Sequence, residues 1–173
     1  MQNLFKCSHL TSSGMRPEGL RTRSDSLVID MHCHMLVQAA DALARQHAPK
    51  TPEPAQRFAS AQTRQASIAM VQGVQQQLVS VDRRIEDMDA SGIDLQVISP
   101  APGHYCYWAD DELARTLARM VNDHLAAVAS AHDTRLLAFG TVPLQSPRLA
   151  IEELTRCVKE LGMRGVEICS HVQ

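Results

Sequence analysis

The stretch Leu27-Val28-Ile29-Asp30-Met31-His32-Cys33-His34 joins a β-branched, apolar run to two histidines that are two residues apart. The run predicts a short strand. Residues two apart on a strand project from the same face, with Cα atoms about 6.5 Å apart, and two imidazoles at that spacing can bind one metal ion. We therefore expect His32 and His34 to be metal ligands, with Asp30 on their face and Cys33 turned toward the helices. The alternative is a pair of core histidines held by hydrogen bonds.

A regular alternation of helices and strands follows this motif. The expected elements are, in chain order, a helix over Ser80–Ser91, a strand over Leu95–Ser99, a helix over Asp110–His132, a strand over Leu136–Val142, a helix over Pro147–Leu161 and a strand over Gly165–Cys169. The alternation implies right-handed crossovers and a parallel sheet. It fits either an open doubly wound sheet or the N-terminal half of a (β/α)8 TIM barrel, with about four β/α units. Two histidines at the end of the first strand favour the barrel, whose active sites lie at the carboxyl ends of its strands.

Apolar spacing assigns the buried faces of two of these helices. The helix over Asp110–His132 carries one apolar stripe that includes His124, so this histidine is expected to be buried and structural. The helix over Pro147–Leu161 is expected to be buried through Leu154 and Val158, among other residues. In contrast, the Ala-, Gln- and Pro-rich stretch Gln38–Gln77 predicts a long excursion with short helices and little core.

Composition and charge exclude several classes of protein. The formal net charge is −2, from 17 Lys and Arg against 19 Asp and Glu, so no basic excess predicts binding to nucleic acid or an anionic membrane. No apolar run reaches the roughly 18 residues of a spanning helix. The five cysteines form no CxxC pair, which is typical of reduced thiols in the cytoplasm. Residues 1–26 predict a disordered extension, with a transit peptide as the alternative, and residues 27–173 a barrel domain.

The first strand resembles the signature of the amidohydrolase superfamily, and the rest of the chain resembles the aminocarboxymuconate-semialdehyde decarboxylases and their relatives. The stretches that carry this resemblance, besides Ile29–His34, are Arg84–Asp89, Tyr107–Ala109, Gly140–Gln145, Arg156–Gly162, Gly165–Ile168 and Ser170–Val172. The resemblance implies a (β/α)8 barrel with one divalent metal ion, zinc or alternatively manganese, bound by His32 and His34. It also implies a small-molecule carboxylate substrate and a homo-oligomer for the full-length relative.

The resemblance also implies that the chain stops before the active site is complete. Relatives complete the metal site with a strand-five histidine and a strand-eight aspartate, and a strand-six histidine transfers protons; none of these lies in this chain, so no catalytic residue is expected within it. The leading hypothesis is a metal-dependent decarboxylase of a small unsaturated or aromatic carboxylate, inactive as this fragment alone. The alternatives are a hydrolase of the same superfamily and a non-catalytic remnant. By region, Arg57 and Arg64 are candidates for the arginine that holds the substrate carboxylate.

Aromatic residues cluster in the loop after the second strand, where they are expected to form a wall facing the substrate. They are His104, Tyr105, Tyr107 and Trp108. Among them Tyr107 and Trp108, together with His171 after the fourth strand, are the expected substrate-binding residues. The alternatives are a loop that packs its own aromatic side chains and, for His171, a motif position without a ligand role.

Overall fold

The computed structural model describes residues 27–49 and 58–172. Its elements are β1 (Ile29–Met35), α1 (Gln38–His47), α3 (Ala61–Gly73), α4 (Gln75–Val79), α5 (Val81–Ser91), β2 (Leu95–Pro100), the 3-10 helix η1 (Pro102–His104), α6 (Asp111–Ala131), β3 (Leu136–Gly140), α7 (Pro147–Lys159) and β4 (Gly165–Val166). The predictions for residues 1–26 and for Arg57 lie outside the described residues. Within the described ranges, no helix is both long and apolar enough to cross a membrane.

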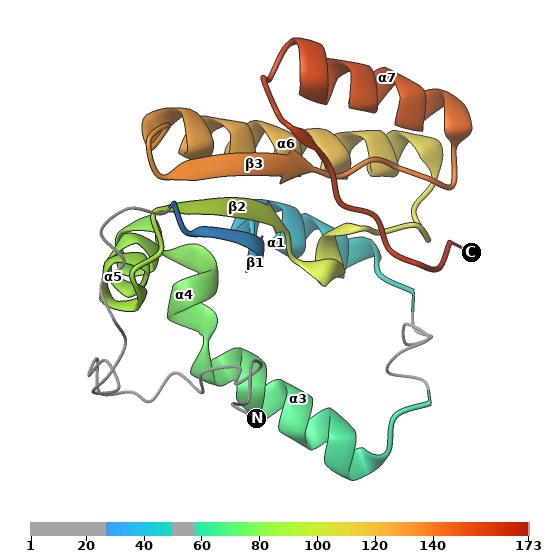
Figure 1. Cartoon of the computed structure of the whole chain (residues 1–173). Coiled ribbons are helices and arrows are strands. Elements are labelled where there is room, and N and C mark those ends of the chain that lie inside the picture. Colours follow the sequence, from blue (N-terminus) through green and yellow to red (C-terminus); the bar gives the residue numbers. More distant parts are fainter. Residues whose placement is uncertain (1–26, 50–57, 173) are drawn as a thin grey trace, which may run out of the picture.

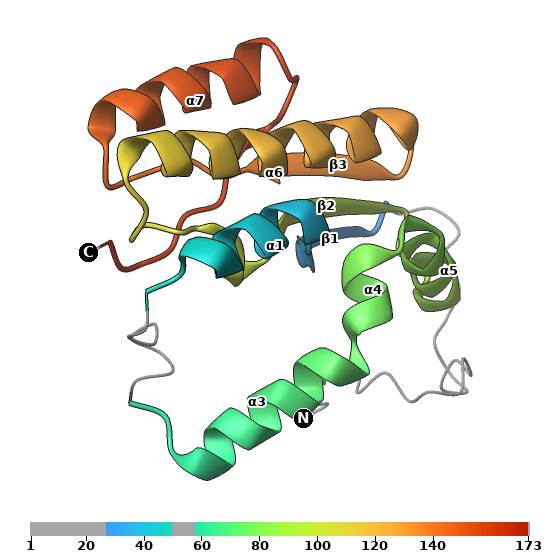
Figure 2. The same cartoon turned by 180° about the vertical axis from the view of Figure 1, so that it is seen from behind.

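The four strands form one parallel sheet in the order β1-β2-β3-β4. Figures 1 and 2 show α1, α6 and α7 on one side of this sheet. A doubly wound sheet would carry helices on both faces and would reverse its strand order at a switch point. Strands in sequence order with helices on one side are instead the arrangement of the first half of a (β/α)8 barrel.

Local sequence signals set several of the element ends. The Ser80 hydroxyl accepts a hydrogen bond from the Arg83 amide and caps α5, and Gly92 ends the same helix in the left-handed region with φ 68°, which glycine adopts without strain. The two last strands are shorter than expected, since β3 ends at Gly140 and β4 covers only two residues. The Glu167 amide nevertheless donates to the Gly140 carbonyl, so pairing with β3 continues beyond β4.

A bulge in β1 changes which side chains share a face. Asp30 is in register with Gln96 and Cys33 with Ile98, so three steps along β1 match two along β2. Gln96 and Ile98 lie on the helix side of the sheet, where Gln96 contacts Arg84 of α5 and Ile98 is fully buried. Residues three apart on a regular strand would point to opposite faces, but the additional residue of the bulge lies between Asp30 and Cys33. Like their partners Gln96 and Ile98, Asp30 and Cys33 therefore both point to the helix side. The prediction that Asp30 shares the face of the histidines is therefore wrong.

The buried face of α6 is rotated from the expected one. Leu125 is buried as predicted, but His124 is exposed, and Asn122 is fully buried in addition. The Asn122 amide oxygen accepts from the Thr141 amide at 2.7 Å, and its nitrogen donates to Glu153 Oε1 at 2.8 Å. Since these partners belong to α7 and the segment before it, the buried stripe turns toward α7. The prediction of a buried His124 is wrong.

The buried face of α7 is rotated as well. Glu153 is buried, whereas Leu154 and Val158 are 41% and 48% exposed, so the prediction that these two apolar residues are buried is wrong. Arg156 donates to Glu153 Oε1 at 2.7 Å, and together with Asn122 it keeps the buried carboxylate paired. One apolar side of α7 is therefore left on the surface.

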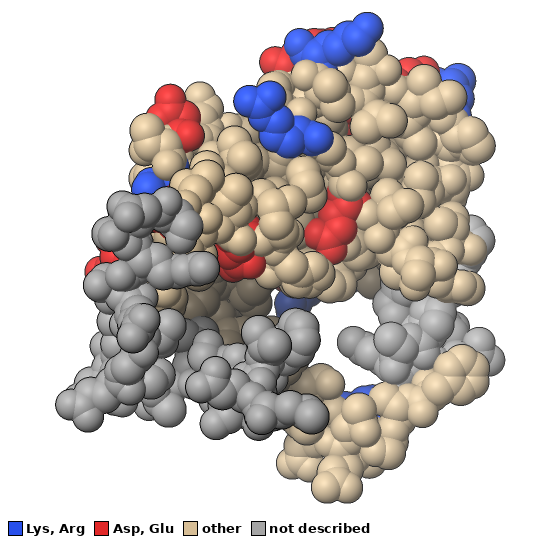
Figure 3. Space-filling view, in the orientation of Figure 1, with Lys and Arg blue, Asp and Glu red and all other residues tan. Residues whose placement is uncertain are grey.

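The excursion between β1 and β2 has two different parts. Ala40 and Ala44 of α1 are buried in the core on the helix side, so the expectation of little core is wrong for this helix. In α3 no residue is buried, and Figures 1 and 2 show this helix apart from the sheet. On the face shown in Figure 3, an opening separates it from the main body, and charged side chains lie in small groups among uncharged atoms.

Candidate functional site

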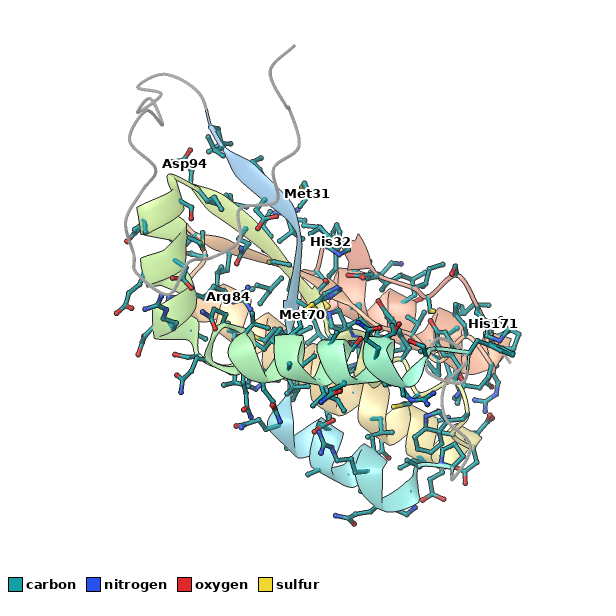
Figure 4. The ribbon with its side chains drawn as sticks, turned by 90° about the horizontal axis from the view of Figure 1, so that it is seen from below. Met31, His32, Met70, Arg84, Asp94 and His171 are labelled. Atoms are coloured by element: carbon teal, nitrogen blue, oxygen red, sulfur yellow. The ribbon has the colours of Figure 1, made fainter. Side chains whose placement is uncertain are left out.

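The two histidines of β1 open onto one space at the carboxyl end of the sheet. Their ring centroids are 4.8 Å apart and the planes meet at 77°, edge to face. His32 is exposed and His34 is half-buried, so both rings are accessible to an ion from solvent. In Figure 4 His32 projects from one side of β1 while Arg84 lies on the other.

Hydrogen bonds orient the His34 ring. Its Nδ1 lies 3.0 Å from the carbonyl oxygen of Pro100 and 3.3 Å from the Ser99 hydroxyl. A carbonyl can only accept, so Nδ1 carries the proton and a neutral ring presents its lone pair at Nε2. A backbone carbonyl on the other ring nitrogen is the usual second contact of a metal-binding histidine.

These two imidazoles fit a divalent metal ion, as two nitrogen ligands from one strand. Structural zinc sites use four protein ligands and catalytic ones three. Among the residues that the structure describes, no group of three or more His, Cys, Asp or Glu side chains could hold a metal ion. In the described part of the chain, His32 and His34 are therefore two candidate ligands of such a site.

Glu167 and Tyr105 add an acid and a phenol beside His34. Glu167 Oε1 lies 4.0 Å from His34 Nδ1 and accepts a hydrogen bond from the Tyr105 hydroxyl at 2.8 Å. Burial and the adjacent Glu167 carboxylate raise the pKa of Tyr105, so the phenol remains a proton donor. Sequence reasoning missed Glu167, although alternation with the apolar residues Val166 and Ile168 would have placed it on the inner face of the sheet.

The three expected substrate-binding residues lie in different surroundings. Tyr107 is buried, and its hydroxyl accepts from the Cys169 amide at 3.3 Å. Trp108 packs against the core on the helix side. His171 is exposed and lies well away from His32 in Figure 4. The structure thus brings Tyr107 close to the segment after β4, beside Tyr105, whose ring stacks on it at 5.8 Å.

His104 supports a helix and does not face the inner side of the sheet. It is 3% exposed, and its Nε2 accepts a hydrogen bond from the Val37 amide at 2.9 Å, at the start of α1. Desolvation by burial lowers the pKa of His104 to about 4, so the ring is neutral near pH 7. His104 therefore lies apart from the inner face on which the wall was expected, and its partner Val37 lies outside the loop.

Cys33 lies between the two histidines but is not available as a ligand. Burial raises the pKa of its thiol to about 12, and the thiol donates to the Val97 carbonyl at 3.2 Å. Cys33 is in register with Ile98 and points to the helix side, so its thiol is not placed to share an ion with the two imidazoles. A cavity of about 270 Å³ lies away from the histidines. Leu136 and Met163 line it, and Leu136 is at the amino-terminal end of β3, whereas the histidines are near the carboxyl end of β1.

Comparison with known sequences connects this geometry to a family. The sequence model of the amidohydrolase family matches residues 29–173. The 2-amino-3-carboxymuconate-6-semialdehyde decarboxylase of Dictyostelium discoideum is 40% identical over 91 residues, which cover 53% of this chain and 25% of that protein. A gamma-resorcylate decarboxylase of a Polaromonas species is 42% identical over 84 residues, covering 49% of this chain and 26% of the relative. The chain thus spans about a quarter of the length of these curated relatives.

Solved structures show the same arrangement of strands and helices. A 2,6-dihydroxybenzoate decarboxylase in complex with 2,6-dihydroxybenzoate matches with a TM-score of 0.65 and 26% identity, over 86% of this chain and 40% of that chain. A 5-carboxyvanillate decarboxylase of Novosphingobium aromaticivorans, in complex with manganese, matches with a TM-score of 0.69 and 27% identity, over 88% and 44% of the two chains. Both agree with the first half of a (β/α)8 barrel.

Proposed function

Since this chain belongs to the amidohydrolase family, we propose that it forms the metal-binding half of a decarboxylase that acts on a small aromatic or unsaturated carboxylate. The observation that carries the proposal is the pair His32 and His34, whose rings meet at the carboxyl end of β1. The similar proteins named above are decarboxylases, which favours carbon–carbon cleavage over the alternative of hydrolysis. Residues 27–173 would form one partial barrel domain.

The metal would be held by His32 and His34, with its remaining ligands supplied from outside the described residues. A bound divalent ion acts as a Lewis acid that polarises the reacting group. We propose zinc, with manganese as the alternative, because imidazole suits zinc and a similar structure contains manganese. The hydrogen bond from His34 Nδ1 to the Pro100 carbonyl would keep Nε2 free for the ion.

Glu167 would orient the substrate by charge. A carboxylate beside His34 repels a substrate carboxylate at close range, so the anionic end of the substrate would lie away from Glu167 and toward the metal. The Tyr105 hydroxyl holds the Glu167 carboxylate in place. Direct substrate contact by Tyr107, Trp108 and His171 stays a prediction, as does a role for Arg64, which lies exposed on α3.

Titration with zinc tests the metal site. We expect one weak zinc equivalent per chain by isothermal titration calorimetry, because only two protein ligands are present. His32→Ala and His34→Ala should abolish this binding. His47→Ala, which removes an exposed histidine at the end of α1, is the control and should leave it unchanged. Equal zinc binding by all four proteins would contradict the proposal.

Assays of the chain alone test the expected inactivity. The 173-residue chain should release no CO2 from 2,6-dihydroxybenzoate at an enzymatic rate, with zinc or manganese added. Metal-dependent release that His32→Ala abolishes would show that two ligands suffice.

We also propose that the protein forms a homo-oligomer, because the outer sides of β1 and β4 are edges of the sheet that can recruit other chains. We propose the cytoplasm as its compartment, because the four described cysteines are free.

A further inference from the structure

A buried arginine grips β1 from the side opposite the histidine rings. Arg84 of α5 is 6% exposed. Its Nη2 donates to the His34 carbonyl at 2.6 Å and to the Gln77 carbonyl at 2.9 Å, and its Nη1 donates to Gln96 Oε1 at 2.8 Å. Figure 4 shows Arg84 and His32 on opposite sides of β1. The guanidinium thus joins the end of the metal-binding strand to α4, α5 and β2.

A second arm of the same network reaches the other histidine. Gln96 Nε2 donates to Asp30 Oδ2 at 2.8 Å, and Asp30 Oδ1 accepts from the His32 amide at 3.1 Å. The His34 carbonyl is therefore held by Arg84 and the His32 amide by Asp30, with Gln96 as the link between them. Arg84 and Asp30 each contact the backbone of a histidine and not its ring. Both imidazole rings are therefore left on the opposite face of β1.

The network lies where the regular ladder of the sheet is interrupted. The register between β1 and β2 shifts between Asp30 and Cys33, and His32 has no partner in the register of β2. A bulge re-aims side chains but removes the regular pairing that would fix the strand. The hydrogen bond from Arg84 to the His34 carbonyl and the hydrogen bond from the His32 amide to Asp30 fix the strand at these two points.

We propose that Arg84, Gln96 and Asp30 form a clamp that sets the separation and orientation of the two imidazoles for one metal ion. The three are positioning residues, and the inference rests on the proposed function in taking His32 and His34 as the ligands. A buried cation is costly unless its donors are satisfied, and an apolar side chain of similar volume often stabilises a fold as well or better. The planar fork of arginine, in contrast, fixes several acceptors at once.

Substitutions separate a clamp from a residue that only stabilises the fold. Arg84→Lys keeps the charge but loses the fork, and Gln96→Met keeps the volume but disconnects the two arms. The matched control is Arg83→Gln on the same helix, since Arg83 is half-exposed and pairs with Asp87 at 2.8 Å. We expect zinc affinity to fall about 10- to 100-fold in Arg84→Lys and Gln96→Met, the range typical for contacts that orient metal ligands, and to be unchanged in Arg83→Gln.

A conservative pair of variants tests the second arm. Asp30→Asn keeps an oxygen that can accept from the His32 amide but turns an NH2 group toward the NH2 group of Gln96, and two donors cannot pair. Asp30→Ala removes both contacts. Zinc affinity should therefore fall in Asp30→Asn about as far as in Gln96→Met, and further in Asp30→Ala. Urea unfolding of each variant, run in parallel, reports stability: a role limited to stability would lower the free energy of unfolding and leave the zinc affinity of the folded chain unchanged. Asp30→Ala and Gln96→Met carry the test if Arg84→Lys does not fold.

Imidazole NMR of the metal-free chain separates failure of the clamp from failure of the metal site. The 15N shifts of His34 should report one tautomer, protonated at Nδ1, in the wild type and in Arg83→Gln. In Arg84→Lys and Gln96→Met the shifts of His32 and His34 should move toward averaged values. A wild type that binds no zinc would overturn the proposed function, and the NMR comparison would still decide the clamp. Unchanged 15N shifts of His32 and His34 in Arg84→Lys and Gln96→Met would overturn the proposed clamp.

Discussion

The two faces of the sheet differ in how completely they are covered. On the helix side Ile98 and Leu136 are 0% and 1% exposed, within a core cluster that includes residues of α1, α5, α6 and α7. On the inner face Ile29 is 44% exposed, and Leu137 and Phe139 are only half-buried. The helix side therefore supplies most of the stability of this chain, and the inner face presents the side chains available for chemistry.

Two neighbouring leucines of β3 measure this difference directly. Leu136→Ala should lower the free energy of unfolding by about 3–4 kcal/mol, because it removes a fully buried side chain and enlarges the cavity that Leu136 already lines. Leu137→Ala, on the opposite face of the same strand, should lower it by only about 1 kcal/mol, since less area leaves water there. Urea denaturation of both variants gives the comparison, and equal losses would show that the inner face is as well packed as the helix side.

His104, on the helix side, should make the stability of the fold depend on pH. His104 has its pKa lowered to about 4 by burial, with Asp41 and His124 acting in opposite directions. Above pH 6.5, the ordinary pKa of histidine, His104 is neutral in both the folded and the unfolded chain. Between pH 6.5 and pH 4 only the unfolded chain takes up the proton. The free energy of unfolding should therefore fall by about 2–3 kcal/mol between pH 6.5 and 4.

Denaturation at pH 7 and pH 4.5 measures this loss of stability. His104→Gln keeps an acceptor for the Val37 amide but cannot titrate, so the loss should shrink. The control His47→Gln removes an exposed histidine and should keep the full loss. An identical pH dependence in the two variants would mean that His104 is not the residue responsible.

Glycine substitutions extend the comparison to the ends of the strands. A Cβ on Gly140 would lie 2.9 Å from Asn122 Oδ1, Cys157 Sγ and Met163 Sδ, all on the helix side. Gly140→Ala should therefore lower the free energy of unfolding by about 1–2 kcal/mol through overpacking. Gly103→Ala is the matched control, because no atom lies within 4 Å of its Cβ position. Thermal unfolding that shows no difference between them would contradict the tight packing behind β3.

The smallest effect is expected on the outer side of α7. Val158 is 48% exposed, so Val158→Ala should change the free energy of unfolding by less than about 0.5 kcal/mol. Leu149→Ala on the buried side of the same helix, where the leucine is 2% exposed, should lower it by about 3 kcal/mol. A large loss in Val158→Ala would mean that another surface covers this side of α7 in solution, and sedimentation velocity would then reveal the association.

Sequence alone determined the order of the elements and the place of the two histidines. Strands and helices follow from local apolar periodicity, and the ends of α5 follow from Ser80 and Gly92, because a cap and a left-handed residue act on the turn beside them. The position of His32 and His34 at the end of the first strand, together with the β/α alternation, was sufficient to predict half of a barrel. These features depend on neighbours within a few residues, which the sequence displays directly.

Tertiary structure decided which face each polar side chain occupies. The bulge that turns Asp30 toward α5 depends on pairing with β2, 66 residues away. Glu153 is buried because Asn122 and Arg156 neutralise the cost of burying a carboxylate. Glu167 reaches His34 only because both side chains lie at the carboxyl end of the parallel sheet. Each of these outcomes depends on a partner far along the chain, and no local pattern specifies which partner that will be.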